Sequence, residues 1–373
     1  MRQILQGDMF SKFTKSLSIL AFSILLLSFG ATTTAHAEDA KDTVTAEKKE
    51  SSEGKFDPAK VIMEHIMDAH EFHFATIGEH NIAIPLPVII YSKERGLAVF
   101  SFGKLEEGET YNGYKSEEGK IVAVDATGKI EESVTLYDFS LTRNVVQMLL
   151  ALILLVVLML NVAKKYIAGG AKTAPSGFQG WVEPVITFVR DEVCKPNLGK
   201  KYEKYMPYLL TIFFFILINN IIGLIPGTAN VTGNIAFTLV LAVISLLVIL
   251  FSTNFHFWMH IFWPPGVPFL VKFILIPVEL LGVFIKPAAL MIRLFANMVA
   301  GHIVITCFIL LIFIFGAMSH VAGWGFAPVS ILFTVFIYFI EVLVAFIQAF
   351  IFTNLTAVFI GQAMEGAHDD AHH

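Results

Sequence analysis

Ionisable side chains recur at regular spacing inside the most apolar part of the chain. Glu279, Lys286 and Arg293 stand seven residues apart, and Asn297 follows the arginine by four. At about 100° per residue, these four side chains share one face of a helix. A charge near a bilayer centre costs about 2.5–3.5 kcal/mol even on lenient insertion scales, and ionisable groups inside membranes usually mark an ion or proton path. The spacing therefore predicts ion translocation along this face.

Two long apolar segments, 271–317 and 328–361, hold these and further polar residues. Each exceeds the roughly 20 residues that a perpendicular membrane helix needs, so each is expected to be tilted, bent or both. The loop SHVAGWG (Ser319–Gly325) between them predicts an antiparallel hairpin. In such a hairpin, residues at equal depth have numbers that sum to a constant.

The hairpin predicts that polar groups lie at matching depths. From the outer side to the cytoplasmic surface, the matching groups are His302 with Glu341, Arg293 with Gln348, and Glu279 with Gln362 and Glu365. An imidazole beside a carboxylate can take up and pass protons near neutral pH. On an ideal helix His302 points about 180° away from Arg293, so the two are expected to face different compartments.

Structural explanations compete for some of these residues. Lys286 could snorkel to the interface without further function, and Asn297 and Gln348 could simply hold helices together. The histidine–glutamate pair could be a buried structural pair. Arg293 has the weakest such explanation, because its own hairpin supplies no carboxylate at its depth. A buried arginine needs an anionic partner, so we expect another chain to provide one.

The composition places the chain in a membrane. Of its 373 residues, 55% are hydrophobic and 15% are charged, and the apolar residues come in long runs, which is typical of a polytopic membrane protein. The net charge of −5 and the dispersed basic residues argue against a nucleic-acid partner. Cys194 and Cys307 are expected to be free thiols. We expect no metal and no cofactor.

The first 37 residues have the three parts of a secretory signal. A basic n-region precedes the apolar h-region Leu17–Phe29, and Ala35–Ala37 fits an A-x-A cleavage site. With 13 residues, the h-region is short for a membrane helix, so we favour cleavage of 1–37 over an uncleaved first span. The charged segment 38–57 then lies outside the cytoplasm as a disordered linker.

Residues 58–140 are expected to form a small extracytoplasmic α+β domain. Its first part, 58–80, predicts a short helix whose histidines match no metal-site spacing and are interpreted as a solvated face: His65, His70, His73 and His80. From 86 to 140, short β-branched and aromatic runs alternate with turn-like segments such as EEGETYNGY. That pattern predicts a β-rich fold.

The remaining chain predicts a membrane domain over 141–361. Its first span, Val145–Ala163, is followed by a loop with eight basic residues, which marks the cytoplasmic side. Within that loop, 177–193 is amphipathic and is expected to lie at the interface. Further membrane helices are predicted over 207–226, 235–251, 271–317 and 328–361, and the polar tail 362–373 is then cytoplasmic. The predicted fold is an all-α polytopic membrane protein with a tilted C-terminal helix hairpin and a small β-rich extracytoplasmic N-terminal domain.

Two stretches of this membrane domain resemble subunit a of the ATP synthase membrane sector (Fo). They are PVELLGVFIKPAALMIRLFANMVAGH (Pro277–His302) and FIEVLVAFIQAFIFTNLTAVFIG (Phe339–Gly361). The signature RLFANMxAGH is specific, because a membrane arginine followed by asparagine at +4 and glycine at +8 rarely arises otherwise. NNIIGLIPG (Asn219–Gly227) and the following TANVTGN extend the resemblance, which covers roughly residues 140–361.

The resemblance implies a stator subunit of a rotary ATP synthase. In the family, the arginine that matches Arg293 faces a rotating ring of c subunits, each with one membrane carboxylate, and separates two offset half-channels. The cytoplasmic half-channel is assigned to the neighbourhood of Glu279, and the outer one to Asn297, His302, Glu341 and Gln348. Some members exchange the acid and the imidazole of the last pair, and both forms keep the relay chemistry.

The implied partners are the c-ring, peripheral-stalk subunit b, the other ATP synthase subunits and the lipid bilayer of the cell inner membrane. Arginine suits the central task, because its guanidinium does not deprotonate in proteins and it stabilises the ionised form of a passing carboxylate. The chain has no G-x-x-x-x-G-K-[ST] loop, so nucleotide chemistry is expected in other subunits. The histidine–glutamate pair favours H⁺ over Na⁺ as the ion.

Two other functions fit the composition. An autonomous secondary transporter would predict internal repeats with broken helices in matching halves, and the sequence shows no such repeat. A non-conducting scaffold would leave Arg293 unexplained and should tolerate its loss. Residues 38–140 are longer than the corresponding part of familiar family members, and the resemblance assigns them no role.

Overall fold

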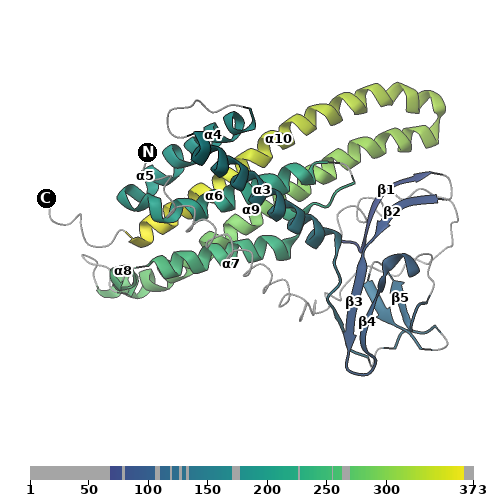
Figure 1. Cartoon of the computed structure of the whole chain (residues 1–373), viewed down its shortest axis with the longest axis horizontal. Coiled ribbons are helices and arrows are strands. Elements are labelled where there is room, and N and C mark those ends of the chain that lie inside the picture. The colour runs from purple at the N-terminus through teal and green to yellow at the C-terminus, as the bar shows by residue number, and fades with distance from the viewer. Residues whose placement is uncertain are drawn as a thin grey trace. The chain divides into compact units, whose positions relative to one another are not determined.

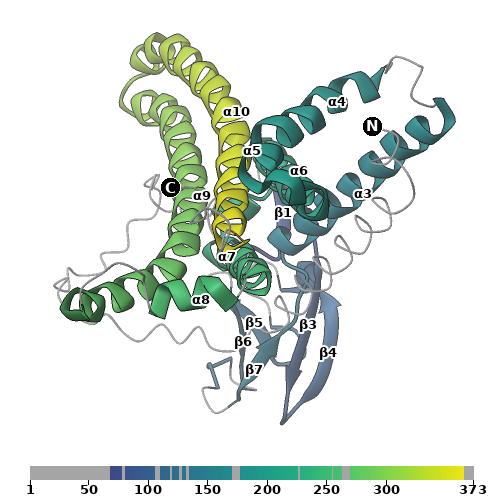
Figure 2. The ribbon, with the colours of Figure 1, turned by 90° about the vertical axis from the view of Figure 1, so that its left-hand side faces the viewer.

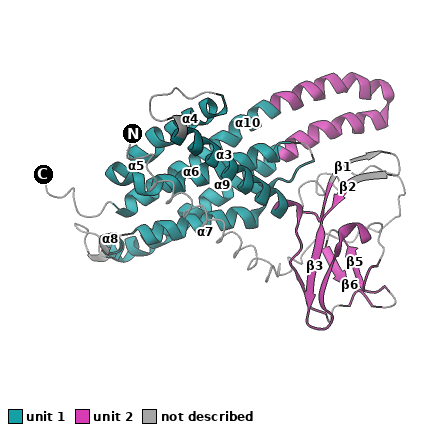
Figure 3. Ribbon diagram, in the orientation of Figure 1, with its two compact units in different colours: residues 1–25, 145–301, 338–373 teal, residues 26–144, 302–337 magenta. Residues whose placement is uncertain are grey.

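The structure is a computed structural model that describes most of the chain after residue 67. The described residues are 68–77, 80–105, 110–117, 120–125, 128–131, 134–169, 177–225, 227–253, 255–262 and 269–364. The predicted signal and linker, 1–57, lie outside them, as does most of the predicted tail. The chain divides into two units, coloured separately in Figure 3. Unit 1 takes in Val145–Gly301 and the residues from Tyr338 onward, and unit 2 takes in the described residues before Val145 together with His302–Ile337.

Helices make up most of the described chain. They are α3 (Arg143–Gly169), α4 (Phe178–Phe188), a π-helical turn (Val189–Cys194), α5 (Lys195–Leu198), α6 (Tyr202–Gly223), α7 (Ile235–Ser252), α8 (Phe255–Phe262), α9 (Phe269–Met318) and α10 (His320–Met364). Five helical stretches among the described residues are long and apolar enough to cross a membrane. The chain is therefore a mostly helical, multi-pass membrane protein, as the sequence predicts.

Burial is uneven among these helices. The most apolar stretch of Phe178–Gly223 is 83% buried, whereas the corresponding stretches of α9 and α10 are 22% and 17% buried. α6 thus forms the core of unit 1, where Phe213 and Phe215 are fully enclosed. The two longest helices leave broad apolar faces uncovered, and such faces are met by lipid or by another chain.

The long helices α9 and α10 lie side by side over much of their length (Figures 1 and 2). Within unit 2 they contact each other through stacked rings, with centroids 5.5 Å apart for Phe308 and Phe333 and 4.0 Å apart for Phe315 and Phe326. These contacts follow the antiparallel register that the sequence predicts. The tilt of the pair relative to a membrane stays a prediction.

The turn between them is tighter than predicted. α10 begins at His320, so most of the expected loop is already helical and only Ser319 lies between the two helices. A side-chain carbon at Gly323 would lie 2.8 Å from the Cα of Gly316. Because both positions lack side chains, the two backbones approach closely, and the chain reverses without an extended loop.

A backbone-to-side-chain clamp fixes the connection between α6 and α7. The amide of Gln147 on α3 donates to the carbonyl of Ala229 and accepts from its N–H, at 2.5 and 2.6 Å. In the same connection, the Nδ2 atom of Asn230 donates to the carbonyl of Met298 on α9 at 3.2 Å. One short loop therefore ties α3 and α9 to the core helix.

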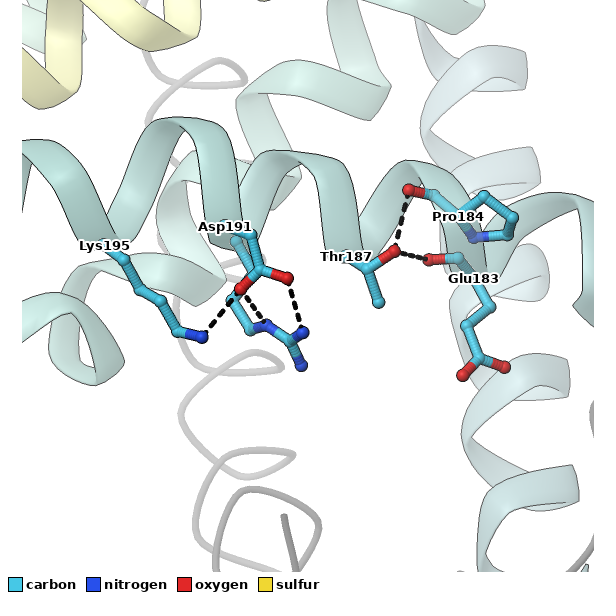
Figure 4. A network of polar contacts seen from close by, with 6 residues as sticks. Glu183, Pro184, Thr187, Asp191 and Lys195 are labelled. Carbon is cyan, nitrogen blue, oxygen red and sulfur yellow. Dashed lines mark hydrogen bonds and ion pairs between the residues drawn. The ribbon is translucent and has the colours of Figure 1, made fainter.

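The amphipathic segment predicted over 177–193 is helical. Pro184 interrupts the hydrogen bonding of α4, and the Thr187 hydroxyl donates to the carbonyls of Glu183 and Pro184 (Figure 4). In the following π-helical turn, the carboxylate of Asp191 accepts from Lys195 at 2.7 Å. Trp181 is 81% exposed. The location of this helix at a membrane interface stays a prediction.

Unit 2 contains the predicted β-rich region. Its strands are β1 (Glu71–Ile77), β2 (His80–Pro85), β3 (Pro87–Ser92), β4 (Gly96–Ser101), β5 (Tyr114–Glu117), β6 (Lys120–Ala123) and β7 (Leu136–Asp138). They form antiparallel sheets in the orders β1-β2, β4-β3-β7 and β5-β6. The core around β3 contains Val88, Ile90, Phe100, Phe102, Leu105 and Tyr114. The side of the membrane on which this region lies stays a prediction.

The predicted helix over 58–80 is wrong in its described part. Residues 71–77 and 80–85 form the β1–β2 hairpin instead. The stretch EFHFATI alternates aromatic and polar residues and ends in β-branched ones, a pattern that favours a strand. Of the four histidines, His70 is buried and not part of a solvated face, while His65 lies outside the described residues.

His70, just before β1, contacts β7 and the turn after β4 within the β-rich region. Its ring Nε2 donates to the Asp138 carboxylate at 3.2 Å, and its ring stacks on Phe102. Asp138 also accepts from the backbone N–H of Ser140 at 2.8 Å. Burial acts to raise the pKa of Asp138, but these hydrogen bonds outweigh it and hold the pKa below its ordinary value of 3.8.

This depressed pKa predicts that the contact between His70 and Asp138 is sensitive to acid. The contribution of Asp138 to stability is complete above the unfolded carboxyl pKa of about 3.9 and is lost as the pH falls through the lower folded value. Asp138→Asn should lack this contribution at every pH. We expect the corrected hydrogen-exchange protection of the Phe139 amide, which donates to Ile89, to fall between pH 5 and pH 2.5 in the wild-type chain and to change little in the variant. Parallel losses in both proteins would contradict this role.

Candidate functional site

The four polar residues predicted to share one face of α9 all lie exposed on that helix: Glu279, Lys286, Arg293 and Asn297. Large apolar side chains surround them, and Ile292, next to the arginine, is 56% exposed. A separate stripe attaches the helix to unit 1 through the buried Leu290, Leu294 and Met298. On an ideal helix, Leu294 and Met298 lie about 100° and 140° from Arg293, so the arginine stands beside the packed stripe, on the exposed part of the helix.

The guanidinium of Arg293 stands on this exposed face. Among the described residues, no carboxylate forms an ion pair with its guanidinium. A cation on the exposed face of a membrane helix is costly unless an anion or water meets it. The arrangement therefore leaves a fixed positive charge on the exposed face of α9, without a carboxylate partner among the described residues.

Lys286 has a different setting on the same face. Its Nζ donates to the Oε1 atom of Gln362 on α10 at 3.2 Å and lies 5.0 Å from the ring centre of Phe359. Gln362 was predicted to lie level with Glu279, but it bonds to Lys286, which is seven residues further along α9. Two prolines inside this part of α9, Pro277 and Pro287, interrupt the helical hydrogen bonds, so an ideal-helix register does not hold through it.

Glu341 is enclosed on α10, with a side chain only 8% exposed. Its carboxyl group lies over the Cα of Gly301 on α9, and a side-chain carbon at Gly301 would overlap both carboxyl oxygens. The glycine at this position of the RLFANMxAGH signature therefore makes the space that the carboxyl group occupies. His302 is half-buried in unit 2, and its pairing with Glu341 stays a prediction.

The buried stripe of α10 contains more of the predicted residues. Gln348 is buried two helical turns after Glu341, and Ala345 lies between them on the same stripe. The predicted polar residues thus divide into two groups. Those on α9 before Gly301 face outward, and those on α10 face the interior of unit 1.

Two asparagines that the sequence did not mark as site residues reach this stripe. Asn219 and Asn220 on α6 are both 0% exposed. The Nδ2 atom of Asn220 donates to the carbonyl of Ala345 at 3.2 Å, whereas that of Asn219 donates to Phe215 of its own helix. The sequence did contain a signal for these residues, which is two consecutive amide side chains in an otherwise apolar helix. Such groups are costly in a membrane unless they have hydrogen-bond partners.

The donor set suits proton transfer. Carboxyl and amide groups face the interior of unit 1, and a guanidinium that cannot deprotonate lies on the surface. Among the described residues, no group of three or more His, Cys, Asp or Glu side chains is placed to hold a metal ion.

Comparison with known proteins identifies relatives for both parts of the chain. A family described as "ATP synthase A chain" matches residues 145–361, and a domain of unknown function (DUF8433) matches residues 61–139. ATP synthase subunit a of Chloroherpeton thalassium is 46% identical over 239 residues, covering 63% of this chain and 69% of the relative. ATP synthase subunit a 2 of Prosthecochloris aestuarii is 36% identical over 356 residues, which is 93% of each chain.

The contact between Gly301 and Glu341 predicts a specific sensitivity to added volume. Gly301→Ala should destabilise the protein by about 1–3 kcal/mol, because the new methyl group displaces a carboxyl group from an enclosed space. Gly282→Ala is the matched control, since a side-chain carbon there has no neighbour within 4 Å. It should stabilise the helix by about 0.5–1 kcal/mol. Thermal unfolding in detergent measures both, and equal shifts would contradict the packing described.

Proposed function

The chain belongs to the ATP synthase A chain (subunit a) family, and we propose that it is the stator subunit that carries protons to and from a rotating c-ring. As a family member it is a multi-pass membrane component of ATP synthase that works with the other subunits of that complex. The finer proposal concerns the path. Two offset half-channels lead to the ring, and Arg293 separates them.

The outward, unpaired guanidinium of Arg293 is the observation that carries this proposal. No carboxylate among the described residues pairs with it, and a membrane arginine needs an anion, which we propose comes from a partner. A ring of subunits, each with one membrane carboxylate, supplies such anions in succession. The exposed apolar side chain of Ile292, next to the arginine, supports a partner that slides past, because it offers no fixed polar contact to break.

Arg293 then acts through its permanent charge. It stabilises the ionised form of a ring carboxylate, so the carboxyl group releases its proton into one half-channel as it arrives. After passing the arginine, the carboxylate is reloaded from the other half-channel. The same positive charge repels protons that would otherwise cross directly between the channels. Lysine would serve less well, because an ammonium group can lose its proton in an apolar site.

The two groups of polar residues support the two half-channels. Glu341 and Gln348, in the interior of unit 1, belong to the outer half-channel with His302 and with Asn297 near the ring. Glu279, exposed toward the other end of α9, belongs to the cytoplasmic half-channel. The driving force is about 2.3 kcal/mol per charge per 100 mV, so several protons are needed for each ATP.

Orientation follows from charge. The loop between α3 and α6 contains most of the basic residues near the membrane, which places it in the cytoplasm. The β-rich region and the α9–α10 turn then lie on the opposite side of the cell inner membrane. This arrangement directs Glu279 and the loop toward the cytoplasm, where subunit b of the peripheral stalk is the proposed partner.

Removing the charge at Arg293 tests the proposal. In inverted membrane vesicles, Arg293→Ala should abolish ATP-driven proton pumping while the complex still assembles, as judged by blotting for the other subunits. Lys286→Ala removes a positive charge from the same face and is the matched control. It should retain most of the pumping, because Lys286 bonds to α10.

Normal pumping by an assembled Arg293→Ala complex would exclude the stator mechanism and favour a non-conducting scaffold role for this chain. Proton transport by the purified chain alone in liposomes would favour an autonomous transporter.

A further inference from the structure

We propose that one face of the sheet β4-β3-β7 lies against the membrane, with its side chains at the boundary between lipid headgroups and acyl chains. The occupant of this face is the lipid bilayer itself, and the contact is apolar and not electrostatic. The face, called here the sheet patch, consists of Ile89, Tyr91, Leu97, Val99 and Tyr137. This inference goes beyond the proton path and does not depend on it, because it rests only on the β-rich region and on the membrane span that follows it.

Strand alternation separates the sheet patch from the core. Val88, Ile90 and Phe100 belong to the core of the β-rich region, so the residues that alternate with them on β3 and β4 point to the opposite face. An antiparallel sheet with one buried face usually has polar side chains on the other. Here Leu97 and Val99 are apolar and are 67% and 63% exposed. A second apolar face on one sheet indicates an interaction surface.

The sheet patch is continuous across three strands. Tyr91 on β3 stands directly opposite Leu97 on β4 and Tyr137 on β7, and Ile89 stands opposite Val99. The ring centroids of Tyr91 and Tyr137 are 6.5 Å apart. These five side chains include no charged group. Tyrosine is enriched where membrane meets water, because its ring is apolar and its hydroxyl group stays hydrated. The composition of the patch therefore suits the lipid interface.

The membrane lies close to the sheet patch along the chain. β7 ends at Asp138 and α3 begins at Arg143, so the end of the sheet and the start of the helix are at most about 18 Å apart. The candidate span Arg143–Ile167 has 25 residues, which makes it about 37 Å long. Because the hydrocarbon layer is only about 30 Å thick, the ends of this span reach the headgroup layers. The sheet therefore follows directly from a helix end at the membrane surface.

Hydrogen bonds hold the link between the sheet and the helix in place. The N–H of Phe139 donates to the carbonyl of Ile89, a residue of the sheet patch, at 2.8 Å. At the start of α3, the N–H of Arg143 donates to the carbonyl of Ala69, just before β1, at 2.9 Å. Arg143 itself belongs to unit 2, so no loose linker separates the β-rich region from this end of the span. The patch therefore stays within reach of the membrane surface, which favours lipid over a soluble partner.

The absence of charge in the sheet patch sets the kind of contact. Attachment through basic side chains depends on anionic lipids and is screened by salt. An apolar face instead inserts at the boundary between headgroups and acyl chains in proportion to the apolar area that it buries. The contact gives the β-rich region a second attachment to the membrane beside α3, and it should be insensitive to both salt and lipid charge.

Fluorescence quenching by spin-labelled lipid tests the contact. The intact complex, otherwise free of reactive cysteines, is reconstituted into phosphatidylcholine vesicles with or without a lipid that carries a nitroxide near the top of its acyl chain. In this chain Cys194 and Cys307 are replaced by serine, and Val99→Cys is labelled with a fluorophore. Ile130→Cys is the matched control, because Ile130 is an apolar residue of the same region that is 50% exposed and lies outside the sheet β4-β3-β7.

We expect the nitroxide lipid to quench the label at Val99→Cys about threefold more strongly than the label at Ile130→Cys, because only the former reaches the acyl boundary. High salt or added phosphatidylglycerol should leave this ratio unchanged. Leu97→Glu in the same labelled chain introduces a charge into the sheet patch and should bring the two positions close to equal quenching.

Equal quenching at the two positions in the original labelled chains would overturn the inference. Protection of the label at Val99→Cys from both the nitroxide lipid and aqueous iodide would also overturn it, by showing that protein covers the sheet patch. A disulfide between two unlabelled Val99→Cys chains would then identify a second copy of this chain as the cover, and its absence would identify another subunit. Loss of quenching at high salt would overturn the apolar nature of the contact.

Discussion

A guanidinium on the exposed face of a membrane helix, with no carboxylate partner in the part of the chain that the structure describes, is the constraint on which this molecule depends. Such a charge persists in a membrane only if another molecule meets it. Arg293 is held in this position because Leu294 and Met298 are buried on an adjacent face of α9, and Asn230 bonds to the backbone of that stripe. The fold therefore exposes the positive charge of Arg293, and the proposed anionic partner would come from another subunit.

The interior of unit 1 contains the opposite arrangement, in which the polar side chains of Glu341 and Asn220 are buried. Glu341 is enclosed by α9 only because Gly301 has no side chain. Asn220 is held against α10 by a hydrogen bond to the Ala345 carbonyl. In the proposed mechanism, the outer half-channel runs past these buried groups, while Arg293 stands on the exposed face of α9. That separation would keep the two half-channels apart.

Sequence alone predicted the parts that follow from periodicity. Spacing by seven placed Arg293 and Lys286 on one exposed face, and the antiparallel register agrees with the stacking of Phe308 on Phe333. Features that depend on tertiary packing were missed. The early start of α10 accompanies the close approach of Gly316 and Gly323. The β1 strand was predicted to be part of a helix, although its alternation of aromatic and polar residues favours a strand. Asn220 was missed because its partner, a backbone carbonyl, has no sequence signal.

The most direct test asks what stands opposite Arg293 in the assembled complex. In a chain with Cys194 and Cys307 replaced by serine, Ile292→Cys would be oxidised against a c subunit that has a cysteine one turn from its membrane carboxylate. The account predicts a disulfide between the two subunits for Ile292→Cys, which is 56% exposed, and none for Leu294→Cys, which is 1% exposed. No cross-link at either position in an assembled complex, or equal yields at both, would contradict the claim that this face of α9 meets the ring.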